Sequence, residues 1–361
     1  MSKIDQPLLF ITAVLILTGI FILSSASVVI SQKNYGITYA YTLRHLIYVF
    51  AGIAAAFTAQ AIPFGFWKKI ALPLLIFSMF LLALVFLPKI GFEHGGAKRW
   101  LNLSFFTIQP AEILKFSLAV YLAGWLSSRK GEEKSLNKAF IPFVIIISIV
   151  SVLLILQPDI GTLGVVVIMS CFLYFIGGGK ISQLMALAGL SLIVLYFIIQ
   201  AAPYRLERLE TFLNPTRDRE GAGYQITQSF IALGSGGIWG RGLGKGIQKY
   251  NYLPEPIGDS IFAVWGEETG FLGIFIFIAL LLLFLWRGIY ISRKSSDFFG
   301  MLLGFGLTVG ITTQAVINIG AISGLLPLTG IPLPFISYGG SAMIVNLASV
   351  GVLLNISKNN R

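Results

Sequence analysis

The chain has 361 residues, of which 56% are hydrophobic and only 11% are charged, and its formal net charge is +11. Soluble domains carry about 25% charged residues, so this composition excludes an ordinary soluble protein and indicates a polytopic membrane protein. In such a protein the basic excess indicates orientation and anionic lipid partners, not nucleic acid. The single cysteine, Cys171, excludes a disulfide within the chain, and the two histidines lack the spacing of metal ligands.

Ten apolar segments are long enough to cross a bilayer, which takes about 20 helical residues. They cover residues 7–30, 43–63, 69–88, 107–127, 139–157, 159–178, 181–201, 258–286, 298–320 and 340–356. The sequence therefore predicts an all-α polytopic membrane protein that forms a single domain over residues 1–361. No internal repeat is evident, so the inverted-repeat plan of many transporters is not supported.

The basic residues predict how the chain is oriented. They are concentrated in the short connections on the side of the N-terminus, such as residues 129–138 and 287–294. By the positive-inside rule, both termini are expected in the cytoplasm. A long connection between the seventh and eighth spans, about residues 202–257, then lies outside. Its glycines, aromatic residues and mixed charges predict a large ordered loop with interfacial or re-entrant helices.

Three clusters of polar residues lie in the first half of the chain. They are GGAKRWLNL with Lys98 and Arg99, QPAEILK with Glu112 and Lys115, and QPDIGT with Asp159. Lys98 and Arg99 are open to two interpretations, as interfacial anchors or as ligands of an anionic substrate. Glu112 and Lys115 share one helical face, which favours a structural ion pair. Asp159 is interpreted as a helix N-cap.

A fourth cluster is NYLPEPIGDSIFAVWGEETG, which contains Asp259, Glu267 and Glu268. Along one continuous helix the two glutamates lie about 12–13.5 Å beyond Asp259, well inside the bilayer. An ionised acid at that depth costs about 2.5–3.5 kcal/mol, so at least one glutamate is expected to pair with a cation such as Lys115. Asp259, at the outer end of its span, is either an N-cap or a general base that faces an outer cavity.

Eight motifs in a fixed order resemble the SEDS family, the polytopic FtsW/RodA proteins of bacterial cell-wall synthesis. They are GGAKRWLNL, QPAEILK, QPDIGT, GAGYQITQS, GSGGIWGRGLG, QKYNYLPE, GEETG and LPFISYGGS. The similarity covers nearly the whole chain, and its GYQ and QKYNYLPE forms look most like FtsW, the septal member.

The resemblance implies an inverting peptidoglycan glycosyltransferase that polymerises lipid II, a disaccharide-pentapeptide on undecaprenyl pyrophosphate, at the outer face of the bacterial cytoplasmic membrane during cell division. The family's essential aspartate maps onto Asp259, the arginine of its RW motif onto Arg99, and its buried acid and base onto Glu112 and Lys115. Gly258 and Ser260 depart from the threonine and phenylalanine that commonly flank the acid, which puts its local hydrogen bonding in question.

The implied chemistry agrees with the residues. A carboxylate such as Asp259 can take the proton of an attacking sugar hydroxyl, and cations must meet the pyrophosphate that leaves. The candidate cations are Lys98, Arg99, Arg241, Lys245 and Lys249. No tightly bound cofactor and no carboxylate cage for a metal are expected, and help from a divalent cation, Mg²⁺ or Mn²⁺, is left open.

The resemblance also implies partners. These are lipid II and the growing glycan strand, a class B penicillin-binding protein (an FtsI-like transpeptidase) and other membrane proteins of the division machinery. Two alternatives stay open: a flippase that carries lipid II across the bilayer, and a non-enzymatic scaffold. The charge lies mainly on the outer side and marks no pathway through the midplane, which disfavours the flippase.

Overall fold

The structure is a computed structural model that describes residues 4–87, 90–94, 97–102, 107–129, 131–200, 203–214 and 221–358. Each predicted span overlaps one main helical element. These helices are α1 (Gln6–Ala26), α3 (Ala40–Ala61), α5 (Ala71–Leu84), α6 (Pro110–Ser127), α7 (Ile141–Leu156), α8 (Ile160–Ile176), α9 (Ile181–Gln200), α12 (Ile261–Arg293), α13 (Phe298–Ile322) and α14 (Gly340–Lys358). Within the described residues, seven helices are long and apolar enough to cross a membrane, and α5 and α8 are shorter apolar helices. The predicted multi-pass helical architecture is confirmed.

Shorter helices occupy the connections. They are α2 (Val28–Tyr35), α4 (Phe64–Lys69), the π-helical turn η1 (Leu136–Phe140), α10 (Pro203–Leu213) and α11 (Ala222–Ser235). The last two lie in the long connection that the sequence predicts to be an ordered loop, so this connection has helical structure over much of its described length.

The all-α expectation misses a small antiparallel sheet. Its strands are β1 (Gly91–His94), β2 (Ala97–Asn102) and β3 (Thr107–Ile108), in the order β1-β2-β3. The GGAKRWLNL motif supplies all of β2, which carries Lys98 and Arg99. Strands of two to six residues between long apolar helices leave too short a pattern to be read from the sequence.

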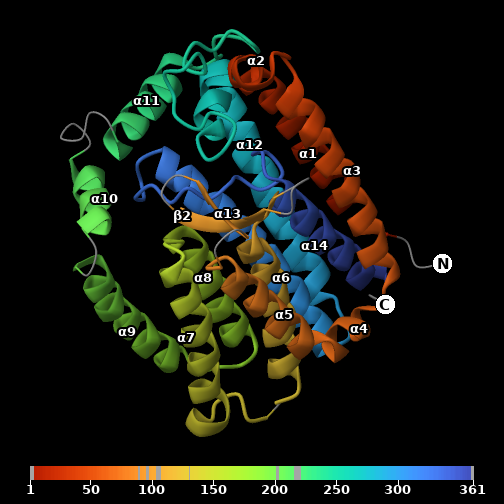
Figure 1. Ribbon diagram of the computed structural model, residues 1–361. Coiled ribbons are helices and arrows are strands. Elements are labelled where there is room, and N and C mark those ends of the chain that lie inside the picture. The colour runs from red at the N-terminus through yellow and green to blue at the C-terminus, as the bar shows by residue number, and fades with distance from the viewer. Residues whose placement is uncertain are drawn as a thin grey trace.

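The two termini lie together at one end of the helical bundle, because the Asp5 amide donates to Ser357 Oγ (3.3 Å). Arg287, near the end of α12, forms a two-pronged ion pair with the Asp5 carboxylate, with a shortest distance of 2.7 Å. The sheet lies toward the opposite end, where α6 and α8 begin (Figure 1). We call these two ends the terminal end and the sheet end.

Helix α13 forms the centre of the bundle, and nearly all of its residues are buried. Lipid is as apolar as leucine, so helices in a membrane associate through close packing of small residues, not through the hydrophobic effect. At Gly304 an added Cβ would overlap Ser292 of α12, and at Gly351 it would overlap the backbone of Ala56 between α14 and α3. These contacts fix α12 against α13 and α14 against α3.

Helix α12 is not a continuous span, because it reverses at Gly270 (φ 68°, ψ −167°). In one straight helix Phe262 and Phe277 would lie about 22 Å apart. Their ring centroids are 6.2 Å apart, and those of Trp265 and Phe277 are 6.3 Å apart. Residues 261–269 therefore pack antiparallel against residues 271–293, and the two segments form a helical hairpin with its tip at Gly270.

The glycine-rich motif GSGGIWGRGLG closes this tip. Breaking a helix leaves carbonyls and amides without intrahelical partners, and burying them unpaired is costly. Four backbone hydrogen bonds pair them: Arg241 N to Glu267 O (3.0 Å), Gly242 N to Glu268 O (3.0 Å), Phe271 N to Gly237 O (2.9 Å) and Leu272 N to Ile238 O (3.1 Å). The two backbones approach so closely that a side chain on Gly240 would overlap the Glu268 carbonyl.

Replacement of Gly270 by alanine is expected to destabilise the protein. The positive φ disfavours any side chain, and the new Cβ would overlap the Gly240 amide nitrogen. We expect a loss of about 2–3 kcal/mol, measured as a fall of several degrees in the melting temperature in detergent. Gly189→Ala is the matched control, since a Cβ there meets nothing within 4 Å. Equal melting temperatures for the two variants would contradict the hairpin.

Candidate active site

Asp259 lies in the turn just before the hairpin, and its main chain is held by the C-terminal motif LPFISYGGS and by α13. Three hydrogen bonds do this: Ser337 Oγ to Gly258 O (2.6 Å), Tyr338 N to Ile257 O (2.8 Å) and Asn318 Nδ2 to Asp259 O (2.9 Å). Because these bonds use only carbonyl groups of the turn, they fix its backbone and leave the Asp259 carboxylate available.

The Asp259 side chain is half-buried and has a specific partner in α11. Gln225 Nε2 donates to Asp259 Oδ1 (3.3 Å) and to Ser260 Oγ (2.9 Å), so one amide positions both residues. Ser260, not Asp259, precedes the first residue of α12, so the N-cap interpretation of Asp259 is wrong. Burial, with the nearby charge of Glu255, raises the pKa of Asp259 to about 6, although the Gln225 hydrogen bond lowers it in part.

The Arg99 side chain extends from β2 toward the Asp259 turn. It is buried, and it donates to the carbonyls of Gln157 (Nε, 3.4 Å) and Pro158. A Cβ on Gly330 would lie 3.7 Å from Arg99 Nη1 and 3.9 Å from Asp259 Oδ2. The Arg99 guanidinium and the Asp259 carboxylate therefore lie on either side of the space that a side chain at position 330 would occupy.

The predicted pair Glu112 and Lys115 is confirmed at 2.8 Å, deep in the bundle. Lys115 Nζ also donates to Gln314 Oε1, and Gln314 Nε2 donates to the carbonyl of Pro332 (2.9 Å). One turn along α13, Asn318 binds the carbonyls of Ile331 (2.8 Å) and Asp259. The ion pair thus positions Gln314 on α13, the helix that also holds the Asp259 turn, and Lys115 has no role at Glu267 or Glu268.

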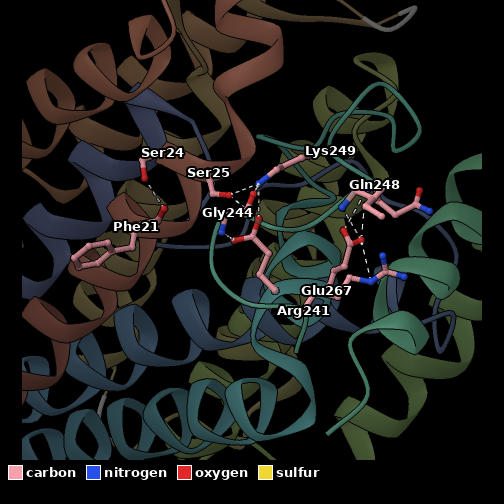
Figure 2. A network of polar contacts seen from close by, with 10 residues as sticks. Phe21, Ser24, Ser25, Arg241, Gly244, Gln248, Lys249 and Glu267 are labelled. Carbon is pink, nitrogen blue, oxygen red and sulfur yellow. Dashed lines mark hydrogen bonds and ion pairs between the residues drawn. The ribbon is translucent and has the colours of Figure 1, made fainter. Parts of the chain in front are cut away.

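Glu267 (Figure 2) and Glu268 lie away from Asp259, at the tip of the hairpin. Their buried carboxylates accept from backbone amides of the long connection: Gly244 N to Glu268 Oε2 (2.9 Å), Ile247 N to Glu267 Oε1 (2.8 Å) and Gln248 N to Glu267 Oε2 (3.1 Å). The expected depth and partner were therefore wrong. The chain turns back at Gly270, so the glutamates rise from Asp259 toward the end of α1 instead of descending into the bilayer.

Lys249 completes this cluster, which we call the glutamate clamp: Glu267, Glu268, Lys249 and Ser25. The Lys249 ammonium is buried and donates to Glu268 Oε1 (2.7 Å), Ser25 Oγ (2.6 Å) and the Gly244 carbonyl (2.7 Å). All three ammonium donors are used, so the predicted role of Lys249 in substrate binding is not supported by its placement. Ser25 in turn donates to Glu268 (2.6 Å), which joins α1 to the long connection.

The other predicted cations are not gathered at Asp259. Lys98 is exposed on β2, next to Arg99 in the chain. Arg241 and Lys245 are exposed on the tip of the hairpin, where Arg241 Nε lies 3.7 Å from Glu267 Oε1. Asp159 is the predicted N-cap of α8, as its two carboxylate oxygens accept from Thr162 N (3.2 Å) and Thr162 Oγ1 (2.9 Å). No cluster of three or more metal-ligating side chains occurs among the described residues.

Comparison with known proteins decides the family. The family model FTSW_RODA_SPOVE, described as "Cell cycle protein", matches residues 6–361. The chain is 37% identical over 358 residues to "Stage V sporulation protein E" of Bacillus subtilis, covering 99% of this chain and 98% of that protein. It is 39% identical over 360 residues to "Probable peptidoglycan glycosyltransferase FtsW" of Coxiella burnetii, covering 98% and 96%. The chain belongs to the FtsW/RodA/SpoVE family.

Two solved structures agree with this membership. One belongs to work described as "Structural coordination of polymerization and crosslinking by a peptidoglycan synthase complex", with a TM-score of 0.83 and 28% identity over 100% of this chain and 99% of that one. The other is the rod shape determining protein RodA of Thermus thermophilus, with a TM-score of 0.72 and 26% identity over 99% and 98% of the two chains. The resemblance drawn from the motifs is confirmed.

Sequence reasoning on this FtsW/RodA/SpoVE protein missed the residues that orient the acid. Gln225 lies within the GAGYQITQS motif, but nothing in the sequence says that its amide meets Asp259. Gln314 and Asn318 did leave a signal, since they are two polar residues four apart within an apolar helix and therefore share one face.

The glutamate clamp gives a stability prediction. Lys249→Met leaves Glu268 buried without its cation, which typically costs about 3–5 kcal/mol. Adding Glu268→Gln removes the unpaired charge, so the double variant is expected to recover part of the lost melting temperature. Lys245→Met is the matched control on the same loop, since Lys245 is exposed and its loss is expected to change little. A double variant less stable than Lys249→Met would contradict the clamp.

Proposed function

We propose that this protein is a peptidoglycan glycosyltransferase that polymerises lipid II at the outer face of the bacterial cytoplasmic membrane during cell division. The observation that supports it best is the half-buried carboxylate of Asp259, which faces the Arg99 guanidinium across the space left by Gly330. The names of the FtsW relatives point to the same activity. Both termini would then lie in the cytoplasm, and the sheet end would face outward.

The proposed reaction needs a base and a cation side by side. The 4-hydroxyl of the incoming unit attacks the anomeric carbon of the growing strand and forms the new C–O bond. Asp259 takes the hydroxyl proton, and the bond to the lipid pyrophosphate breaks with its electron pair on the leaving oxygen. Attack opposite the leaving group inverts the anomeric centre. Arg99, with Lys98 beside it, would stabilise the charge that develops on the pyrophosphate.

The described residues offer no cage for a resident metal, so we propose no tightly bound cofactor. Asp259 and Glu255 are the carboxylates that would help to hold Mg²⁺ or Mn²⁺ together with substrate phosphate oxygens, which is how Mg²⁺ is usually bound at phosphate sites. Such an ion would stabilise the charge of the leaving group.

The proposed partners follow from the same family. A neighbouring structure belongs to a peptidoglycan synthase complex, which supports a class B penicillin-binding protein as the partner of this chain. Other membrane proteins of the division machinery are proposed on family membership alone. The flippase and scaffold alternatives require no base at Asp259, so substitution of this residue separates them from the enzyme.

Asp259→Asn is expected to abolish polymer formation while the protein folds normally, because the amide keeps the shape of the side chain and cannot accept the proton. The assay follows glycan strands made from lipid II by the protein reconstituted with its transpeptidase partner. Glu132→Gln, at an exposed surface ion pair, is the control and is expected to polymerise normally. If Asp259→Asn polymerises normally, the base is misassigned. Protein-dependent transfer of lipid II across vesicles without polymer would favour the flippase.

The pH dependence gives an independent test of the base. Asp259 must be deprotonated to act, so the rate is expected to fall as the pH drops below its pKa of about 6, by about tenfold for each further unit. Gln225→Met removes a donor that favours the charged carboxylate, so the pKa of Asp259 rises and the acid limb moves to higher pH. Gln228→Met, one turn along α11, is the control. Loss of rate at every pH without movement of the limb would indicate a merely structural Gln225.

A further inference from the structure

The tip of the hairpin, residues 236–245 with 266–272, presents an apolar surface on a fixed backbone. Four apolar side chains on it are strongly exposed: Ile238 (65%), Trp239 (78%), Leu243 (64%) and Phe271 (65%). A flexible loop usually buries such apolar side chains by folding them inward. The tip cannot fold inward in this way, because the glutamate clamp and the four backbone hydrogen bonds hold the backbone of the connection in place. The exposed side chains are therefore presented to something outside the chain.

This surface continues the exposed apolar side of α12. Exposed apolar residues recur at helical spacing from the tip toward the terminal end: Phe271, Phe275, Ile278, Leu282 and Trp286. The stripe is about 22 Å long from its first to its last residue. Ile238 and Trp239 extend it at the tip, because the Leu272 amide donates to the Ile238 carbonyl (3.1 Å). A tryptophan thus marks each end of an apolar band whose length approaches the hydrocarbon thickness of a bilayer.

Two cations complete the pattern. Arg241 and Lys245 are exposed on the same tip, next to Trp239 and Leu243 in the chain. Tryptophan with arginine or lysine at the edge of an apolar band is typical of the membrane–water interface, where the ring lies at headgroup level and the cations meet phosphates. A protein partner would more often present a hydrophobic pocket to a central aromatic anchor. The exposed side chains of the tip have the same apolar character as those of the α12 stripe.

We propose that the hairpin tip is inserted into the headgroup layer of the leaflet at the sheet end, with Trp239 as its interfacial anchor and Arg241 and Lys245 bound to phospholipid phosphates. This assigns the two cations to the bilayer instead of to the pyrophosphate of the substrate. It also fixes the height of the catalytic turn. Phe262, three residues after Asp259, packs beside Phe277, about 9 Å below Phe271 along the helix. The Asp259 turn therefore lies nearer the terminal end than the tip does.

The test measures depth in a bilayer. The full-length protein carries Trp239→Cys in a Cys171→Ser background, is labelled with an environment-sensitive fluorophore and is placed in nanodiscs of phosphatidylglycerol and phosphatidylcholine. Phe275→Cys marks the hydrocarbon region, and Asn137→Cys, in an exposed connection, marks water. Spin-labelled lipids with the quencher near the headgroup should quench position 239 several-fold more than lipids with the quencher deep in the chain. Position 275 should show the reverse order.

The cations are tested in the same nanodiscs. Arg241→Gln with Lys245→Gln is expected to lower the headgroup quenching at position 239 at least twofold in phosphatidylglycerol discs, and much less in discs of phosphatidylcholine alone. If position 239 instead behaves like position 137, the tip lies in water or against a partner protein, and the proposal is overturned. If the double variant leaves quenching unchanged but weakens lipid II binding in detergent without phospholipid, the cations serve the substrate. None of these readouts requires glycosyltransferase activity.

Discussion

The structure depends on one constraint: a helix that breaks in a low-dielectric environment must have its freed backbone groups paired. At Gly270 the chain reverses, and it exposes two carbonyls and two amides that water would satisfy in a soluble protein. The glycine-rich connection supplies all four partners from its own backbone. The two backbones must approach closely to form these hydrogen bonds, so the glycines of GSGGIWGRGLG and Gly270, the last glycine of GEETG, are both required at this joint. The buried glutamates extend it by binding three further amides of the connection.

This joint determines where the candidate base lies. With residues 261–269 folded back beside residues 271–293, the turn before α12 enters the bundle next to α13 instead of ending in solvent. There Asn318 and Ser337 bind its carbonyls, and Gln225 positions the carboxylate of Asp259. Each of these contacts comes from a different part of the chain. A change at the glutamate clamp can therefore alter the turn that carries Asp259 without touching it.

The sequence was sufficient for the helices and for the family, but not for this joint. Long apolar runs indicate spans on composition alone, and each of the ten overlaps one main helical element. Glu112 and Lys115 were correctly paired because a spacing of three on a helix fixes their contact. Glu267 and Glu268 were misplaced because their depth was counted along a straight helix, and one glycine with positive φ invalidates the count. The placement of Lys249, and the contact of Gln225 with Asp259, depend on long-range packing that local patterns do not encode.

The buried charged residues of the protein are of two kinds. Glu268 with Lys249, and Glu112 with Lys115, are ion pairs, and such pairs fix geometry at little net gain in stability. Asp259 is different, because its hydrogen-bond donors do not compensate its burial, and its pKa rises to about 6. Arg99 is bound to two carbonyls yet still faces the gap at Gly330. Structural stability does not require an incompletely paired carboxylate beside a fixed cation. Proton transfer next to a phosphate leaving group does require this arrangement.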